Sequence, residues 1–292
     1  MVEYSLALLF AFLAPLMWAI MNIFDKYVVD NKVKDTVGFT VMSGAFNFLC
    51  GLIIAVIVTW NGIGFAQIWP SIIVGILYAA FCFIYMVSLE KSDISSITGM
   101  MYLYPIIVAI LAFIFLGETL TPLGYLGAGL TIVGVIILSL NFYDISIKGL
   151  LPIISIILIL GVWEFFIKVA SDTLTVWQGT AIIQMVAGIV LLSALVIPKV
   201  RKNAVGEIRN FHWGIIVVIF ESLGVWVGFY AMQSLDVTFV SCIGTLQPFF
   251  VLVIEWVTHQ YVPMAKDENF IQKLIAIAII VIGVILLTMT GA

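Results

Sequence analysis

A single carboxylate stands near the middle of a long apolar segment in the second half of the chain. Glu221 lies in the run 212–235, and Gly224 and Gly228 follow it on the same helical face. A charge in hydrocarbon costs roughly 2.5–3.5 kcal/mol on insertion scales, so this side chain must face protein, water or a partner. The glycines would leave its face open to a cavity, where Glu221 could exchange a proton for a cationic substrate. The alternative is a protonated side chain that is hydrogen-bonded to a neighbouring helix.

Two polar pairs with equal spacing stand in the two halves of the chain. Glu164 and Lys168 are four residues apart, as are Asn22 and Lys26, so each pair would share a helical face. The second-half pair is either an intrahelical ion pair near the membrane surface or a contact for a substrate amine or carboxylate. Because the two pairs match in position, we expect a role near the mouth of a cavity, with Lys26 and Lys168 in gating or coupling.

Aromatic and amide side chains extend this candidate site. Trp18 precedes Asn22 by one helical turn and Trp163 is adjacent to Glu164, so these indoles could form cavity walls. The predicted substrate-binding residues are Trp18, Asn22, Tyr78, Tyr102, Trp163, Glu164, Glu221, Trp226 and Gln247.

Two prolines interrupt apolar segments at equivalent places. Pro105 and Pro248 each remove a helical hydrogen bond, so they predict helix kinks that either turn free carbonyls toward a cavity or make room for packing. Among the other polar side chains, Asn47 and Gln184 are expected to form interhelical hydrogen bonds. Glu118 is expected to cap the helix that follows it or to pair locally.

The chain lacks the motifs of soluble catalysis. It has no Walker loop, no GxSxG sequence and no HExxH sequence. Cys50, Cys82 and Cys242 show neither CxxC spacing nor a nearby histidine pair, so we expect them to be small packing residues. The sequence therefore predicts no enzyme, no metal site and no cofactor, and nothing in it indicates a nucleic-acid partner.

The composition is that of a membrane protein. Hydrophobic residues make up 64% of the chain and charged residues 10%, against roughly 25% charged in soluble domains. Apolar runs of about 20 residues, each able to cross a ~30 Å hydrocarbon core as a helix, recur along the whole chain. No basic residue precedes the first run, so we expect it to remain as the first helix rather than to be a cleaved signal peptide. The predicted spans are 4–25, 37–60, 68–89, 95–116, 122–141, 149–171, 177–197, 212–235, 238–258 and 270–290.

The predicted spans form two related sets of five. Pro248 follows Pro105 by 143 residues, and the same offset places Glu221 on Tyr78. Other residues coincide at offsets of 142 or 143: Lys26 with Lys168, Asp30 with Asp172, Asp93 with Asp236 and Ser95 with Thr238. Five is an odd number, so the second set must enter the membrane from the opposite face. The predicted fold is an all-α integral membrane protein of ten transmembrane helices in two inverted repeats, 1–143 (helices 1–5) and 144–292 (helices 6–10).

Basic residues gather on one side of this topology. Eleven of the 12 lysines and arginines fall in the odd-numbered loops between spans, and Lys168 is the exception. The positive-inside rule therefore predicts that the odd-numbered loops are cytoplasmic and that both termini lie outside the cytoplasmic membrane. The dense cluster Lys199–Arg209 is either an orientation determinant beside anionic headgroups or a lipid- or nucleotide-binding patch.

The order of motifs resembles a known family. Ser88–Asp93 is followed by the Tyr-Leu-Tyr-Pro segment 102–105, by Phe-Leu-Gly-Glu-Thr-Leu-Thr at 115–121 and by the glycine-rich segment 124–135. The second half repeats part of this order at 231–236, 246–248 and 281–284. The arrangement resembles the EamA-type branch of the drug/metabolite transporter superfamily over nearly the whole chain. Tyr261 departs from it, because it stands where the first half has Glu118.

This resemblance implies ten helices around a central cavity. Helices 1, 3, 4, 6, 8 and 9 would surround a substrate, and helices 5 and 10 would pack at the periphery. Gly127 and Gly134 fit that arrangement, because they lie on one face of helix 5 and let a neighbouring backbone approach. Members of the family usually have cytoplasmic termini, which is the reverse of the orientation that the charges predict.

The main functional hypothesis is a secondary active transporter of small organic metabolites, amino acids or related amphiphilic solutes. It would work by alternating access as an exporter, an exchanger or a proton-coupled carrier. One alternative is a flippase for a lipid-linked sugar or another lipid, and a second is a non-transporting membrane scaffold or sensor. The expected partners are a small-molecule solute and membrane lipids, with a homo-oligomer as a further possibility.

Overall fold

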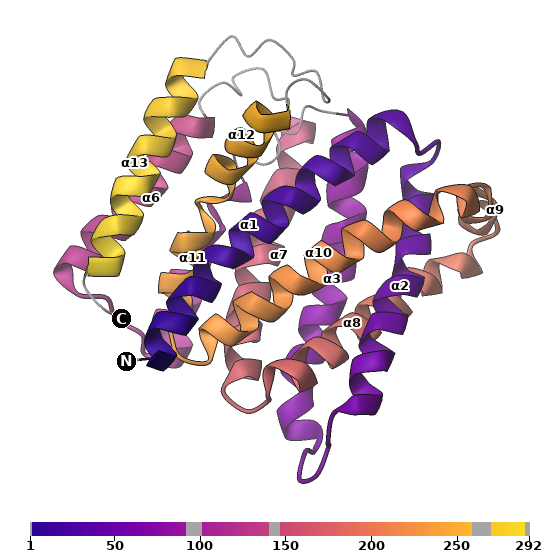
Figure 1. Cartoon of the computed structure of the whole chain (residues 1–292), viewed down its shortest axis with the longest axis horizontal. Coiled ribbons are helices and arrows are strands. Elements are labelled where there is room, and N and C mark those ends of the chain that lie inside the picture. Colours follow the sequence, from indigo (N-terminus) through magenta and orange to yellow (C-terminus); the bar gives the residue numbers. More distant parts are fainter. Residues whose placement is uncertain (1, 92–100, 140–146, 259–269, 290–292) are drawn as a thin grey trace.

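The computed structural model describes residues 2–91, 101–139, 147–258 and 270–289. These residues form a bundle of helices with no strand among them (Figure 1). In the described part, eight helices are long and apolar enough to cross a membrane, and Tyr104–Leu116 and Pro122–Leu138 are shorter apolar helices. The chain is therefore an all-helical, multi-pass integral membrane protein. Asp93, Ser95 and Tyr261, which entered the comparison of the two halves, lie outside the described residues.

The helices occupy the places where apolar runs predicted them. The first half contains α1 (Val2–Asn31), α2 (Thr36–Ile57), α3 (Phe65–Lys91), α5 (Tyr104–Leu111), the π-helical turn η1 (Ala112–Leu116) and α6 (Pro122–Ser139). The second half contains α7 (Ile147–Ser171), α8 (Val176–Ser193), η2 (Ala194–Val196), α9 (Pro198–Gly206), η3 (Ile208–Asn210), α10 (Phe211–Met232), α11 (Val237–Gly244), α12 (Gln247–Thr258) and α13 (Phe270–Met289).

The end of the first helix and the short helix α9 differ from the prediction. The first helix continues to Asn31, beyond the predicted end at residue 25, because Lys26 and Asp30 form an ion pair one turn apart that supports the polar extension. The short helix α9 was not predicted, because its sequence PKVRKNAVG is polar and gives no hydrophobic run. Pro198 begins it at a position where a missing backbone donor has no cost.

The helix is interrupted at each of the two paired prolines. Pro105 stands at the start of α5, directly after turn residues 102–103. Pro248 likewise follows the first residue of α12, and α11 ends at Gly244. The prolines therefore begin new helices rather than bend continuous ones, since proline fits the first turn of a helix and disrupts its interior. Discontinuous helices of this kind border the binding sites of many transporters.

The glycines of α6 allow a close approach of α13, as the sequence predicted. A Cβ atom on Gly127 would lie 2.7 Å from the carbonyl oxygen of Gly283, and one on Gly134 would lie 2.8 Å from that of Ala276. The two helices pack along their length at one side of the bundle (Figure 1). Without glycine at these contacts, the two backbones could not come so close.

The closest helix pairs join the two halves of the chain. α1 packs on α10, α3 on α7, α2 on α8 and α6 on α13. Two further pairs are α1 with α12 and α5 with α7. Helices far apart in the sequence thus lie side by side through the whole bundle, so neither half forms a separate core.

Polar contacts tie the halves together at one end of the bundle, here named the basic end because it carries the α1–α2 connection (32–35) and α9 with their lysines and arginines. Glu207 Oε1 accepts hydrogen bonds from the backbone amides of Lys34 at 2.9 Å and Asp35 at 3.0 Å. Asn203 donates to Asp35 Oδ2 at 2.7 Å. The cationic side chains of α9 itself remain exposed.

The other end of the bundle, the opposite end, holds the beginning of α1 and the end of α13 (Figure 1). There Glu118 accepts hydrogen bonds from the backbone amides of Val237 at 3.0 Å and Thr238 at 3.2 Å. The expectation that Glu118 caps the following helix or pairs locally is therefore wrong. It caps α11 of the second half, because the bundle brings the start of α11 beside the end of η1, a contact invisible in the local sequence.

Candidate functional site

A cavity of about 890 Å³, counted with the space that opens to the outside, lies within the bundle. Residues of both halves line it, from α1, α2, α3, α5, α7, α10, α12 and positions 101–102. Its aromatic residues are Trp18, Phe39, Tyr78, Phe81, Tyr85, Tyr102, Tyr104 and Trp163. Its polar residues are Asn22, Asp25, Thr40, Ser43, Cys82, Glu164, Glu221 and Gln247. Aromatic rings thus form much of the cavity wall, and single polar side chains stand between them.

The cavity reaches from the middle of the bundle toward the basic end. α2 begins at the basic end and contributes residues of its first two turns, Phe39, Thr40 and Ser43. α10 also begins there and contributes Val217 and Glu221 from its first half. The cavity therefore extends from the middle of the bundle, where α7 contributes Trp163 and Glu164, toward the basic end.

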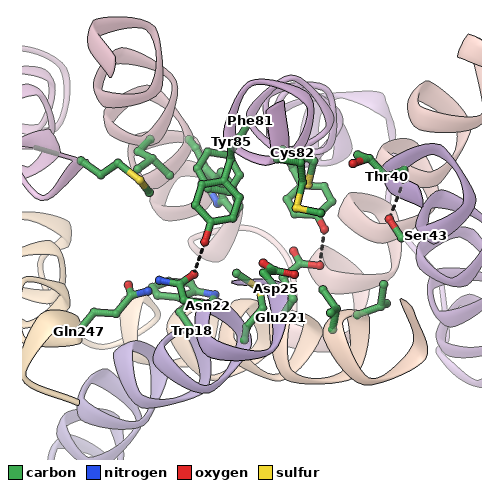
Figure 2. A pocket seen from close by; sticks show the side chains of 18 of the residues that line it. Trp18, Asn22, Asp25, Thr40, Ser43, Phe81, Cys82, Tyr85, Glu221 and Gln247 are labelled. Atoms are coloured by element: carbon green, nitrogen blue, oxygen red, sulfur yellow. Dashed lines mark hydrogen bonds between the residues drawn. The ribbon is translucent and has the colours of Figure 1, made fainter. Parts of the chain in front are cut away.

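Glu221 is a buried polar residue of the cavity wall. The carboxyl group accepts a hydrogen bond at Oε2 from the hydroxyl of Tyr78, drawn as the dashed line at Glu221 in Figure 2. Asn47 approaches that hydroxyl at 3.5 Å. Glu221 is 3% exposed, and its other oxygen, Oε1, is buried without a hydrogen-bond partner among the described residues. Asn47 thus makes an interhelical contact, as does Gln184, which donates to Ser222 at 2.9 Å.

A second carboxylate, Asp25, stands beside Glu221 and was missed in the sequence. Asp25 is 3% exposed, its Oδ1 is buried and unpaired among the described residues, and its side chain points toward that of Glu221 (Figure 2). The two carboxyl groups are close enough to influence each other electrostatically. Asp25 is the last residue of the predicted first span. A carboxylate at that position is expected to lie at the membrane surface, in contact with water. Its spacing could have revealed it, because Trp18, Asn22 and Asp25 follow one helical face.

Several other predicted residues also meet in the cavity. The hydroxyl of Tyr85 donates to Asn22 Oδ1 at 3.0 Å (Figure 2). The ring of Trp163 packs edge-on against Tyr78, with the ring centroids 5.5 Å apart. Asn22 Nδ2, the Tyr102 hydroxyl and Trp163 Nε1 are buried donors without a hydrogen-bond partner among the described residues. The site therefore offers both unused acceptors and unused donors.

Of the two interpretations of Glu164 and Lys168, the intrahelical ion pair is wrong, because the two side chains do not pair. Lys168 Nζ instead lies 3.0 Å from Asp172 and donates to the carbonyl of Met232 at 2.8 Å. In the first half Lys26 likewise pairs with Asp30 at 3.0 Å rather than with Asn22. Both lysines extend toward the ends of their helices, where their charges stay partly hydrated. Glu164 remains in the cavity wall, 5% exposed and without a hydrogen bond or ion pair in the described part of the chain.

Two expectations about α10 are wrong. The face marked by Gly224 and Gly228 is not open to the cavity, because the indole of Trp18 fills it and lies against Gly224. Trp226 does not line the cavity. Its ring packs near Phe10 at 5.6 Å and Trp177 at 5.2 Å between centroids. Side-chain direction on a helix surrounded by others depends on its neighbours, which a single sequence does not specify.

Among the described residues of the cavity wall, the side chains of the acidic and basic residue types are all carboxyl groups. Asp25, Glu164 and Glu221 line it, and no lysine, arginine or histidine is among the described lining residues. Cys82, which was expected to be a packing residue, lines the cavity beside Tyr78 and Glu221 (Figure 2). The described part of the chain contains no cluster of three or more His, Cys, Asp or Glu side chains arranged to hold a metal ion.

Comparisons with known proteins agree with this architecture. One of 29 matching chains of solved structures, described only as "Crystal structure of protein", aligns with a TM-score of 0.67 and 20% identity and covers 98% of both chains. At that identity the likeness shows the fold alone. No curated protein matches the sequence. A model of the EamA-like transporter family matches twice, at residues 5–140 and 147–289, which together span most of the chain. The chain therefore belongs to the EamA-like transporter family and is a membrane transporter of the drug/metabolite type.

Proposed function

We propose that the protein is a secondary active transporter that carries small amphiphilic organic solutes across the cytoplasmic membrane by alternating access. The main support is the cavity itself, which lies between the two halves, carries polar groups at membrane depth and reaches toward one end. Amino acids and related metabolites are the solute class that the sequence suggests. A scaffold or sensor would need no such cavity, and buried polar groups without partners are costly unless they serve binding.

The two halves act in this proposal as inverted repeats, 1–143 and 144–292. The helix pairs support this reading, because exchanging the halves turns one pair into another. α1 with α10 corresponds to α7 with α3, and α1 with α12 corresponds to α7 with α5. In inverted repeats the two halves can exchange conformations. The exchange gives two equivalent states of the transporter, one open at each end of the bundle.

The matched lysines act as a pair of gates. At the opposite end, Lys168 and Ser171 of α7 both donate to the carbonyl of Met232 on α10, at 2.8 and 3.2 Å. These bonds tie two cavity helices together and close that end. Lys26, the counterpart of Lys168, has Asp30 of its own helix as its one described partner, and its side chain is 29% exposed against 16% for Lys168. The structure then corresponds to a state with access from the basic end, and in the other state the two lysines exchange roles.

The orientation follows from charge in this proposal. Lysines and arginines of the α1–α2 connection and of α9 lie at the same end, so the positive-inside rule makes the basic end cytoplasmic and places both termini outside. A cysteine added at the C-terminus should react with an impermeant maleimide applied to intact cells. Reaction only after the cytoplasmic side is exposed would reverse the assignment.

Site-directed labelling tests alternating access. In a variant without native cysteines, Ser43→Cys reports on the cavity at the basic end and Ser171→Cys on the closed contact at the opposite end. A transported solute should change the two labelling rates in opposite directions, because only one end is open at a time. If Ser171→Cys stays unreactive under every solute and gradient while Ser43→Cys is labelled, the cavity is a static vestibule and the proposal fails.

A further inference from the structure

We infer that the transported solute is an organic cation, whose positively charged amine or onium group is held by Asp25 and Glu221 and whose apolar body lies against the aromatic wall. The inference rests on the proposed transport function. It narrows the solute class from amphiphiles in general, amino acids included, to organic cations.

The charge of the cavity is the first argument. Three buried carboxyl groups, those of Asp25, Glu164 and Glu221, face it without a basic residue among the described lining. The nearest lysines in the sequence do not compensate them, since Lys26 pairs with Asp30 and Lys168 with Asp172. Carboxylates in a protein interior need a positive partner or a proton. A cationic solute supplies that charge, and protons replace it when the solute leaves.

The unused acceptors are the second argument. Asp25 Oδ1 and Glu221 Oε1 are buried and unpaired in the described structure, and they belong to neighbouring side chains on α1 and α10 (Figure 2). Buried polar atoms of a native protein normally have a hydrogen-bond partner, and an unsatisfied one indicates a missing group. Two adjacent acceptors match an ammonium group with several N–H donors, or a charged onium group held between them.

The aromatic wall is the third argument. Tyr78, Phe81, Tyr85 and Trp163 cluster on the cavity side of α3 and α7, with ring centroids 5.2 Å apart for Phe81 and Tyr85 and 5.8 Å apart for Phe81 and Trp163. Aromatic faces attract cations as well as apolar groups, most strongly where water is excluded. An anion gains nothing from these faces. The unused donors of Asn22 and Trp163 suit an uncharged oxygen of the solute, so they need no net negative ligand.

Three probes with one aromatic ring separate the charge classes: 2-phenylethylamine is a cation at neutral pH, L-phenylalanine a zwitterion and 3-phenylpropionate an anion. Binding to the detergent-purified full chain is followed by the rise in apparent melting temperature and by tryptophan fluorescence, since Trp18 and Trp163 line the cavity. The amine should bind at least roughly 10-fold more tightly than the zwitterion, a difference of one charge-assisted contact. The anion should not bind.

Variants assign the contact. Asp25→Asn and Glu221→Gln should each weaken amine binding roughly 10- to 100-fold, the usual range for a hydrogen bond to a charged group. Asp25→Glu should retain most of the affinity, which separates loss of charge from loss of fold. Glu3→Gln, which removes an exposed carboxylate at the start of α1, should leave binding unchanged.

Three results would overturn the inference: equal or tighter binding of the zwitterion or the anion, unchanged amine affinity in both Asp25→Asn and Glu221→Gln, or no amine binding at millimolar concentration. If the zwitterion changes the labelling rates of Ser43→Cys and Ser171→Cys in opposite directions, the cation assignment fails and alternating access stands. If the amine binds but does not change the two rates in this way, alternating access fails and the cation assignment stands.

Discussion

Tyr78 on α3 donates a hydrogen bond to Glu221 on α10, and the two residues are 143 positions apart in the chain. That separation equals the offset that aligns Pro105 with Pro248. Two equivalent residues can touch only where the axis that relates the two halves passes between them. Under the proposed inverted repeat, the Tyr78–Glu221 bond therefore marks that axis, and the cavity lies around it. In that proposed arrangement a phenol stands on one side of the axis and a carboxyl group on the other.

Replacing Glu221 with glutamine should uncouple transport from protons. An amide keeps the shape and can still accept from Tyr78, but it takes up and releases no proton. The other titratable groups that face Glu221 are Tyr78 and Cys82 of α3, Asp25 of α1 and Cys50 of α2. Uptake into proteoliposomes with and without an imposed pH gradient measures the effect. If solute flux in the variant still responds to the gradient as in the wild type, Glu221 is not the coupling residue.

Replacing Lys168 with methionine should favour opening at the opposite end. The variant keeps the apolar stem of the side chain but loses the bond to the Met232 carbonyl, so α7 and α10 are no longer tied there. Labelling of Ser171→Cys should rise in the absence of solute. Lys26→Met is the matched control, because the described contact of Lys26 stays within its own helix. Equal labelling in both lysine variants would show that the bond to Met232 does not act as a gate.

Replacing Trp163 with alanine should weaken solute binding while the protein still folds. Its indole lines the cavity and contacts Tyr78 and Phe81, and one aromatic or cation–π contact contributes about 0.5–2 kcal/mol, or roughly a 2- to 30-fold change in affinity. The half-saturation concentration for uptake reports this change. Trp256→Ala removes an indole that is 76% exposed on the bundle surface and should leave the value unaltered. A wild-type half-saturation concentration for Trp163→Ala would place the indole outside the binding site.

Replacing Gly127 with alanine should destabilise the pairing of α6 with α13. The added methyl group would meet the Gly283 carbonyl and Leu287 within 3 Å, and overpacking of this kind costs about 1–3 kcal/mol. Gly129 stands two residues further on the same helix and has open space where its Cβ would lie, so Gly129→Ala is the control. The apparent melting temperature in detergent should fall for the first variant only. An equal response of the two variants would mean that the close approach of the helices contributes little to stability.

The positions of the helices could be predicted from the sequence. Apolar runs long enough to cross a bilayer have to be helical, because the backbone must satisfy its own hydrogen bonds in lipid. Gly127 and Gly134 predicted a close helix contact, since only small residues allow it. The polar helix α9 escaped prediction because its stability comes from contacts such as that between Asn203 and Asp35, which lie far apart in the chain.

The candidate site was predicted in part. The predicted residues that line the cavity include Asn22, Tyr78, Trp163 and Glu221. Polar groups in a membrane-spanning helix face the interior of the bundle or a cavity, because exposure to lipid is costly. Trp226 was wrongly included for the same reason, since an indole can equally pack among other rings. Asp25 was overlooked at the predicted edge of a span.

The sequence by itself determined the membrane class, the helix positions and the family, because each depends on local hydrophobicity and on short motifs. The tertiary structure alone decided which polar groups meet. In the folded chain Tyr78 donates to Glu221, and Asp25 lies beside Glu221. Lys168 donates to the carbonyl of Met232 and does not pair with Glu164. The physical reason is that side-chain partners on packed helices depend on the rotation and crossing of each helix, which are set by contacts between residues far apart in the chain.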